Sequence, residues 1–189
     1  MMNRVGKIAL WSVFAALLAC AAVRATTLVH LSVEQMARAA EVVVRARCVA
    51  NETGWDAGEI WTVTTFQIEE TWKGAPPAVI IVRLLGGRAE NLTSTVDGVP
   101  RFHAGEDVVL FLERTRRGDF SIVSWMQGTF RVRLDRKTDQ ESVVQDTSAF
   151  ATWDAETRRF QADGVRSMRL DALREQVAAA LAWASGKKP

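Results

Sequence analysis

The chain has 189 residues, of which 48% are hydrophobic, with a formal net charge of +2. Three of its 24 basic residues and none of its 22 acidic residues lie in the first 25 positions. The 164 residues beyond them therefore carry 21 basic and 22 acidic side chains, a net charge of about −1. This charge offers no electrostatic basis for binding nucleic acid, which we exclude as a partner, and the length suits one domain with a sizeable core.

Residues 1–25 predict a secretory signal peptide. Arg4 and Lys7 form a positive start, an uncharged apolar run follows over 8–22, and Val23-Arg24-Ala25 offers small residues for cleavage. The apolar run is shorter than the ~20 residues that span a bilayer as a helix. We expect cleavage and export to the periplasm or the extracellular space, with no membrane span afterwards. A retained anchor is the alternative.

The two cysteines suggest different roles. Leu17-Leu18-Ala19-Cys20 loosely resembles a lipobox, so lipidation of Cys20 is a second alternative to simple cleavage. After cleavage Cys48 remains as a single thiol without a disulfide partner. It alternates with apolar residues on one strand face, which predicts a buried hydrophobic side chain instead of a reactive thiol.

The mature chain begins with a predicted helix and two long strands. Ser32 and Gln35 have the spacing of a capping box, and apolar residues at helical spacing follow over 33–40. Strands are predicted at Glu41–Ala50 and Ile60–Trp72, with 51–58 as a polar turn between them.

The second strand changes hydrophobic phase. Trp61 and Val63 lie on one parity, whereas Phe66 and Ile68 lie on the other. A bulge near Thr64-Thr65 would place all four side chains on one face and bend the strand, as the corners of small barrels require.

Further strands complete the predicted sheet. Val79–Leu85 is almost wholly apolar, residues 88–103 form a long polar loop, and Asp107–Glu113 is hydrophobic enough to be central. A hairpin turn at 116–119 leads to the last strands, which end at Leu134. We therefore predict a mainly β fold, a small OB-like antiparallel β-barrel of five to six strands over residues 26–134, with a short N-terminal helix.

The C-terminal part has a different composition. Residues 135–168 are polar and predict a weakly structured segment or a marginal hairpin over 142–163. Leucines and a valine then recur at helical spacing, which predicts a C-terminal helix over 169–185.

Several phrases carry a resemblance to known proteins. They are Ala40-Glu41-Val42-Val43-Val44-Arg45-Ala46, Phe66-Gln67-Ile68-Glu69-Glu70-Thr71-Trp72-Lys73-Gly74, Gly105-Glu106-Asp107-Val108-Val109-Leu110-Phe111-Leu112 and Gln127-Gly128-Thr129-Phe130. Residues 26–134 thereby resemble a family of uncharacterised secreted bacterial proteins and, remotely, the netrin-like OB barrel of tissue inhibitors of metalloproteinases. Those inhibitors chelate zinc through an N-terminal cysteine held by disulfides. Here the predicted mature terminus is Thr26, so the resemblance extends to the fold and not to that mechanism.

The chain offers few residues for catalysis. His30 and His103 are the only histidines, and no Gly-x-Ser-x-Gly motif surrounds a serine. His103 with Glu106 and Asp107 matches no zinc signature, and Gly86-Gly87-Arg88 lacks the lysine and hydroxyl of a phosphate-binding loop. We expect no catalytic residues, no metal site and no cofactor. The paired carboxylates Glu69-Glu70 are expected on opposite faces of the sheet.

Tryptophans are the remaining candidates for ligand binding. Trp61 and Trp72 are assigned to the core or its lid, whereas Trp55, Trp125 and Trp153 lie near loops, where an exposed ring can stack on a sugar or a partner side chain. The alternative is that these three rings simply close the ends of the barrel.

The sequence therefore predicts an exported, non-enzymatic binding module of the bacterial cell envelope, with a protein or glycan partner and an unspecified oligomeric state. One alternative is an inhibitor or accessory protein of a secreted protease, which rests on fold analogy alone. Another is an unrecognised hydrolase that uses His103.

Overall fold

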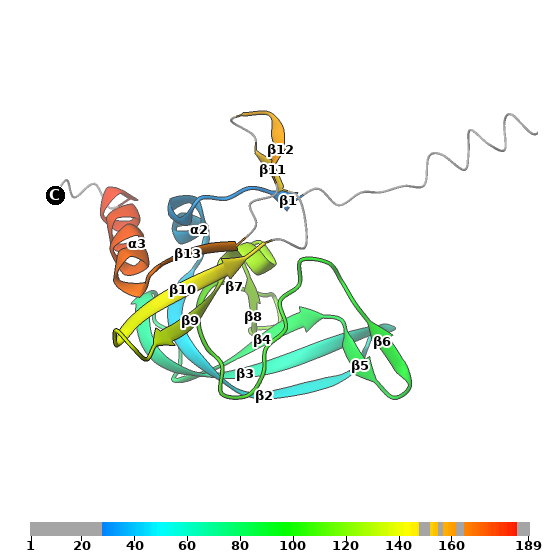
Figure 1. Ribbon diagram of the computed structural model, residues 1–189. Coiled ribbons are helices and arrows are strands. Elements are labelled where there is room, and N and C mark those ends of the chain that lie inside the picture. Colours follow the sequence, from blue (N-terminus) through cyan, green and yellow to red (C-terminus); the bar gives the residue numbers. More distant parts are fainter. Residues whose placement is uncertain (1–27, 148–151, 155–156, 162–164, 185–189) are drawn as a thin grey trace, which may run out of the picture.

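The computed structural model describes residues 28–147, 152–154, 157–161 and 165–184, so the predicted signal peptide and Cys20 lie outside the described residues. Figure 1 shows the elements, which in chain order are β1 (Leu28–Val29), α2 (Val33–Ala39), β2 (Val42–Asp56), β3 (Glu59–Lys73), β4 (Val79–Leu85), β5 (Gly87–Ala89), β6 (Leu92–Ser94), β7 (Asp107–Arg114), β8 (Phe120–Ile122), the 3-10 turn η1 (Trp125–Gly128), β9 (Thr129–Asp135), β10 (Gln140–Asp146), β11 (Thr152–Asp154), β12 (Arg159–Gln161), β13 (Val165–Arg169) and α3 (Leu170–Ala184). No helix in these ranges is long and apolar enough to cross a membrane.

Five strands form a ring of pairings, in the order β2, β3, β4, β8, β7 and back to β2. All neighbours are antiparallel except β4 and β8, which meet in a single parallel bridge between Val82 and Phe120. The predicted fold class is confirmed: the protein is mainly β, with an OB-like five-stranded arrangement, a short helix before the ring and a longer one at the C-terminal side. The capping box of α2 is also present, because Ser32 accepts from Gln35 and Gln35 reaches back.

At the position predicted for the bulge, the extra residue of the β2–β3 ribbon lies in β2 and not in β3. Cys48 pairs with Phe66 and Ala50 pairs with Thr65, so one residue of β2 is extra at this point. β3 itself runs beside β4 without interruption from Trp61 to Gln67. The predicted bulge at Thr64-Thr65 was therefore wrong, although the irregularity lies directly opposite.

The uninterrupted β3 places Trp61 on the outer side of the ring, while Phe66 is fully buried inside. The guanidinium of Arg83 stacks on the Trp61 ring at 5.1 Å, and this contact half-buries an aromatic that the sequence suggested for the core. An outward-facing tryptophan can therefore be partly buried by a neighbouring arginine, and the sequence alone does not distinguish it from a core tryptophan.

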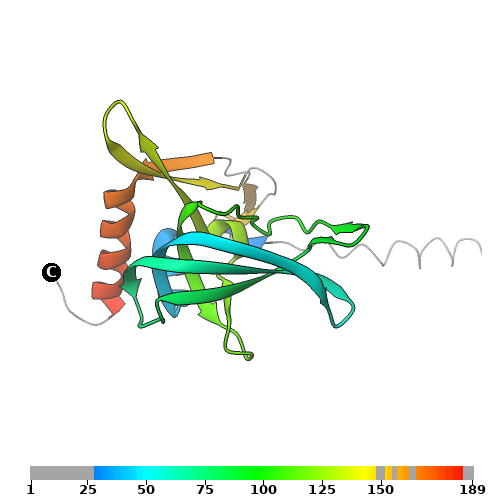
Figure 2. The ribbon, with the colours of Figure 1, turned by 90° about the horizontal axis from the view of Figure 1, so that it is seen from below.

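Strands replace two segments that were expected to be loops. β2 and β3 continue to a two-residue turn at Ala57-Gly58, where both φ angles are positive (51° and 85°), as tight hairpins require. The predicted polar turn over 51–58 is thus mostly strand, and Figure 2 shows this hairpin reaching beyond the ring. Within the predicted loop 88–103, β5 and β6 form a short second hairpin.

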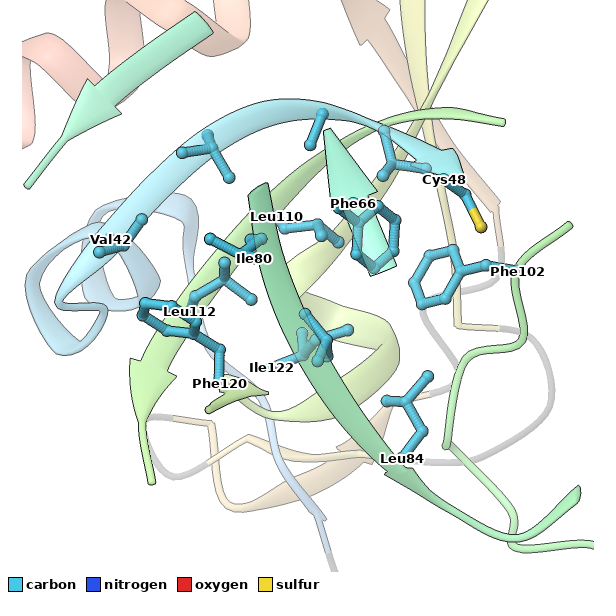
Figure 3. Close-up of a cluster of buried hydrophobic side chains, with 14 residues drawn as sticks. Val42, Cys48, Phe66, Ile80, Leu84, Phe102, Leu110, Leu112, Phe120 and Ile122 are labelled. Carbon is cyan, nitrogen blue, oxygen red and sulfur yellow. The ribbon is translucent and has the colours of Figure 1, made fainter. Parts of the chain in front are cut away.

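Two hydrophobic cores share the central strands. One fills the ring and includes Val42, Phe66 and Leu110, as Figure 3 shows. The other lies on the outer side of β2 and β7, where Val43 and Phe111 pack beneath α2 and α3. Both faces of β7 are therefore buried, which explains its continuous hydrophobic run and confirms that it is central.

The sheet continues past Leu134, where we expected a weakly structured segment. β10 pairs with β9 on one side and with β13 on the other, and Val143 is fully buried in the second core. Gln140, Glu141, Ser142 and Gln145 make this strand polar in the sequence, although Gln145 is buried as well. A marginal hairpin does follow, formed by β11 and β12, and β11 also pairs with β1. The predicted C-terminal helix matches α3.

The phrase Trp72-Lys73-Gly74 joins the end of β3 to α2. The Lys73 ammonium donates to the carbonyl oxygens of Ala37 at 2.8 Å, Arg38 at 3.3 Å and also Ala40, so it caps the C-terminal end of α2. Gly74 has a φ of +82°, and a Cβ there would lie 2.7 Å from the carbonyl oxygen of Glu41. Lys73 thus attaches the end of β3 to α2, and Gly74 allows the chain to pass close to the backbone of Glu41.

We expect Lys73→Met to lower the free energy of unfolding by about 1–2 kcal/mol, because charged hydrogen bonds to helix-end carbonyls are lost. Urea unfolding of the protein measures this change. Lys137→Met, on the exposed turn between β9 and β10, is the matched control and should change stability by less than about 0.5 kcal/mol. Equal effects of the two substitutions would contradict the capping role.

Candidate functional site

A pocket of about 220 Å³ lies where the extended β2–β3 hairpin, the end of β4, β5 and the segment 96–103 meet. Its lining combines hydrogen-bonding side chains, backbone at two glycines and an apolar wall. The lining residues are Asn51, Thr53, Thr62, Leu84, Leu85, Gly86, Gly87, Arg88, Val96, Val99, Pro100, Arg101, Phe102 and His103.

The bulge in β2 creates the polar wall of this pocket. Before the bulge, the inward residues of β2 are apolar and end with Cys48; after it, the inward parity passes to Asn51 and Thr53. Opposite them on β3 stand Thr64 and Thr62. The inner face of the ribbon therefore changes from apolar core at Cys48 to hydrogen-bonding surface at Asn51, three residues further along β2.

Asn51 is held rigidly by its neighbours. Its amide nitrogen donates to the carbonyl oxygen of Phe102 at 3.0 Å and contacts Cys48 Sγ at 3.6 Å, while its oxygen accepts from Thr64 at 2.7 Å. Both amide hydrogens are thus engaged, whereas the carbonyl oxygen retains one lone pair for a ligand.

The two threonine hydroxyls have defined directions. Thr62 donates to the carbonyl oxygen of Gly86 at 2.7 Å, and its oxygen lies 3.2 Å from that of Thr53. Since the Thr62 hydrogen is already used, Thr53 donates to Thr62. The oxygen of Thr53 is left as an acceptor facing the pocket.

Glycine is required where β5 crosses the ribbon. Gly87 has a φ of +136°, and a Cβ there would lie 2.4 Å from Thr62 Oγ1 and 2.5 Å from Thr53 Cγ2. Gly86 has a φ of +92° and would place a Cβ 2.8 Å from the carbonyl oxygen of Ser94. This pair therefore permits close backbone approach and forms part of the pocket floor.

Two arginines and a histidine complete the rim. Arg101 donates to the carbonyl oxygen of Ser94 and to Thr95 Oγ1, both at 3.2 Å, and neither Arg88 nor Arg101 has a carboxylate partner among the described residues. His103 has a side chain that is 83% exposed, and its Nδ1 lies 3.3 Å from Glu106 Oε1. Its expected position on a solvated turn is confirmed.

The contacts of His103 provide a carboxylate but no nucleophile. Glu106 is also shared with Arg131, whose Nη1 lies 2.8 Å from its Oε2. Among the residues that the structure describes, no group of three or more His, Cys, Asp or Glu side chains is placed to hold a metal ion. The charged or titratable side chains of the rim are those of Arg88, Arg101 and His103.

Cys48 lies in the core of the ring, beside Phe66 and Phe102 in Figure 3, and contacts Asn51 of the pocket wall. Its side chain is buried, as predicted, and burial raises the pKa of the thiol above its ordinary value, against the lowering effect of the Asn51 contact. A protonated, buried thiol is a poor nucleophile.

The three candidate tryptophans belong to different parts of the fold. Trp55 is 49% exposed near the tip of the β2–β3 hairpin, Trp125 is half-buried in η1, and Trp153 lies in β11. The Trp153 ring makes an edge contact with Phe160 of β12, at 5.0 Å between centroids. None of the three lines the pocket.

A separate cluster of charges lies on the outer side of the sheet, around Arg45. The Arg45 guanidinium contacts Asp107 at 2.7 Å and Glu141 at 2.5 Å, and more distantly Glu70 at 3.4 Å and Glu69 at 3.6 Å. The two adjacent glutamates were expected on opposite faces, but β3 has a register shift here, so both reach the same arginine.

Glu70 in this cluster is ionised through its partners. Burial raises its pKa, but the indole N–H of Trp72 and the guanidinium groups of Arg174 and Arg45 lower it more, and the net shift is downward. The closest contact, from Arg174 on α3, is 2.5 Å. The cluster thus links α3 and β10 to the ring. Its carboxylates are paired with arginines, so we interpret it as a structural network.

A wider hollow of about 340 Å³ lies beside the β7–β8 turn and is lined by Trp61, Arg83, Thr115, Arg116, Arg117, Asp119 and Ser121. Here Arg117 pairs with Asp56 at 2.5 Å, and Arg83 pairs with Asp56 and with Asp119 at 3.6 Å. Internal ion pairs occupy most of its charges, which makes it a weaker candidate than the first pocket.

No protein-family model matches the chain, and no curated protein matches it either. The site must therefore be interpreted from its own geometry.

Sequence reasoning overlooked most residues of the pocket. The sequence pattern favours a turn for Asn51 and Thr53 and gives no functional signal for Thr62. Gly86-Gly87-Arg88 lacks the lysine and hydroxyl of a phosphate-binding loop, so its part in the pocket is not visible in the sequence. One signal was present: two small polar residues follow the apolar alternation of the first strand at the same spacing, shifted by one position.

Proposed function

We propose that the chain is an exported, non-enzymatic binding module of the bacterial cell envelope, and that the pocket at the end of the ring is its binding site. The observation that supports this most strongly is the abrupt change of the β2–β3 inner face from core to hydrogen-bonding surface. Side chains there are rigidly held but retain acceptor capacity at Asn51 and Thr53. OB-like arrangements commonly bind oligomeric ligands on one open face.

The size of the pocket limits what it holds. About 220 Å³ is below the 300–1,000 Å³ typical of sites for drug-sized ligands. It suits one unit of a longer chain, such as a sugar ring or a peptide side chain, while neighbouring units lie along the rim. This favours a polymeric partner over a free small molecule. The protease-inhibitor alternative rests on resemblance, and no contact described above favours it.

The mature chain, incubated with purified envelope fractions (peptidoglycan, polysaccharide and membrane protein), should co-sediment with one of them. Thr53→Leu, which fills the pocket and removes an acceptor, should abolish this co-sedimentation. Thr138→Leu, on the exposed β9–β10 turn, is the matched control and should bind like the unchanged chain. Far-ultraviolet circular dichroism checks that both variants are folded. Unaltered binding by folded Thr53→Leu would show that this pocket is not the site.

A further inference from the structure

We propose that the pocket recognises an acidic sugar unit, one that carries a carboxylate or phosphate on a polyhydroxyl ring. This rests on the proposed function, since it uses the same pocket. Arg88, Arg101 and His103 line its rim, and no aspartate or glutamate among the described residues lines it. The site is therefore cationic, although the mature chain as a whole carries a net charge of about −1.

The two arginines retain donors for a ligand. Arg101 uses one nitrogen for two long contacts at 3.2 Å, to Ser94 and Thr95, which orient the guanidinium without neutralising it. Arg88 stands on β5 with an exposed side chain and no ion-pair partner in the described ranges. A planar guanidinium binds carboxylate or phosphate through paired hydrogen bonds, so an anion would satisfy both.

A third arginine strengthens this side of the pocket. Arg131 donates to the carbonyl oxygen of Arg101 at 2.8 Å, and its guanidinium lies 5.5 Å from the centre of the Phe102 ring. Its guanidinium also forms an ion pair with Glu106, with 2.8 Å between Nη1 and Oε2. The contact to the Arg101 backbone fixes the rim segment that presents the Arg101 side chain.

The interior of the pocket complements a sugar ring. Thr53 and Asn51 offer acceptors for ligand hydroxyl groups, while Leu84, Val99 and Phe102 provide an apolar wall for the carbon face of the ring. Acceptors inside and cationic donors on the rim match a ligand with hydroxyls on its body and an anionic substituent at its edge.

Two arginines of the second hollow, beside the β7–β8 turn, differ from Arg88 and Arg101 because they form ion pairs. There, Arg83 and Arg117 are paired with Asp56, and Asp119 adds a second carboxylate to Arg83. The Arg117 contact lowers the pKa of Asp56, which keeps that carboxylate charged. In this hollow Arg83 and Arg117 have carboxylate partners, whereas Arg88 and Arg101 at the pocket have none among the described residues.

The test titrates the mature chain with trigalacturonic acid, with its methyl ester, which removes the charge but keeps the ring, and with galactose 6-phosphate. Binding is measured by calorimetry and by the amide signals of Gly86, Gly87 and His103. The pocket variant is Arg88→Gln with Arg101→Gln. The control is Arg133→Gln with Arg136→Gln, which makes the same charge change on exposed positions of β9 and the following turn.

Trigalacturonic acid should bind and shift these amides, and the ester should bind at least about tenfold more weakly. The pocket variant should lose at least about tenfold in affinity, while the control stays within twofold of the unchanged chain (about 0.4 kcal/mol). Binding of galactose 6-phosphate as well would show that charge is recognised; its failure would assign the site to carboxylates.

Equal binding of acid and ester, or equal loss in the pocket and control variants, would overturn the inference. Absence of binding by both anionic probes at concentrations on the order of 10 mM, where even weak specific ligands register, would overturn it too. The proposed function is tested separately, by co-sedimentation with envelope fractions. If the unchanged chain co-sediments and Thr53→Leu does not, the proposed function stands even when the acidic-sugar inference fails. If the unchanged chain does not co-sediment, or if folded Thr53→Leu still does, the proposed function fails.

Discussion

Replacing Arg45 by methionine is expected to lower the free energy of unfolding by about 3–5 kcal/mol, because it leaves Asp107, whose side chain is only 15% exposed, without a cationic partner among the described residues. The Arg45 side chain is only 13% exposed and contacts carboxylates from three other strands: Asp107 on β7, Glu141 on β10, and Glu69 and Glu70 on β3. These contacts raise the pKa of the guanidinium far above its ordinary value, with the hydrogen bond to Asp107 as the largest cause. Urea unfolding monitored by tryptophan fluorescence measures the loss.

Arg47→Met is the matched control, two residues along the same strand. The Arg47 side chain is 48% exposed and pairs mainly with Glu69 at 2.7 Å, so its loss should cost about 0–1 kcal/mol. Hydrogen exchange is a second measurement. In Arg45→Met the exchange rate should increase more for the amides of β10 than for those of β3, relative to the unchanged chain, because Glu141 anchors β10 to the ring through Arg45. Similar costs for the two substitutions would show that the cluster contributes little to stability.

Gln127→Met is expected to lower the free energy of unfolding by about 2–4 kcal/mol. The Gln127 side chain is 2% exposed, and it accepts from the Leu31 amide at 2.8 Å while donating to Val29 at 2.9 Å and to Ser124 at 2.7 Å. Methionine keeps the length of the side chain but leaves these groups without partners in a buried place. The expected loss is measured by thermal and urea unfolding.

The substitution should also release the N-terminal segment, because Gln127 provides the side-chain link between η1 and residues 29–31. Limited proteolysis near Val29 should therefore become faster in Gln127→Met. Gln140→Met, at the exposed start of β10, is the control and should change neither stability nor proteolysis. Unchanged proteolysis in a destabilised Gln127→Met would mean that the loss arises elsewhere.

The structure shows what individual residues do in two of the sequence segments on which the family resemblance was based. In Gln127-Gly128-Thr129-Phe130, the glutamine holds the N-terminal segment, a Cβ on the glycine would lie 2.3 Å from the carbonyl oxygen of Val123, and the phenylalanine packs in the second core. In Trp72-Lys73-Gly74, the indole donates to Glu70 at 3.1 Å and Lys73 caps α2. The roles of Gln127 and Lys73 are not visible from composition or periodicity, because their partners Val29 and Ala37 lie 98 and 36 residues away in the chain.

Local signals in the sequence were sufficient for much of the scaffold. The capping box predicted the start of α2, largely apolar runs predicted β4 and β7, and leucine spacing predicted α3, since each signal lies within the element itself. Burial of Cys48 followed from strand alternation for the same reason.

Only the tertiary structure decided the position of the bulge, the second core and the pocket. An extra residue in β2 is defined by its pairing with β3, and the burial of Val143 in a polar strand depends on cover by helices from both ends of the chain. The pocket needs Asn51, Gly87 and Arg101 brought together from three segments. Such features arise from long-range register and packing, which sequence periodicity cannot encode, and so the chain alone predicted an OB-like scaffold but not the place where it would bind.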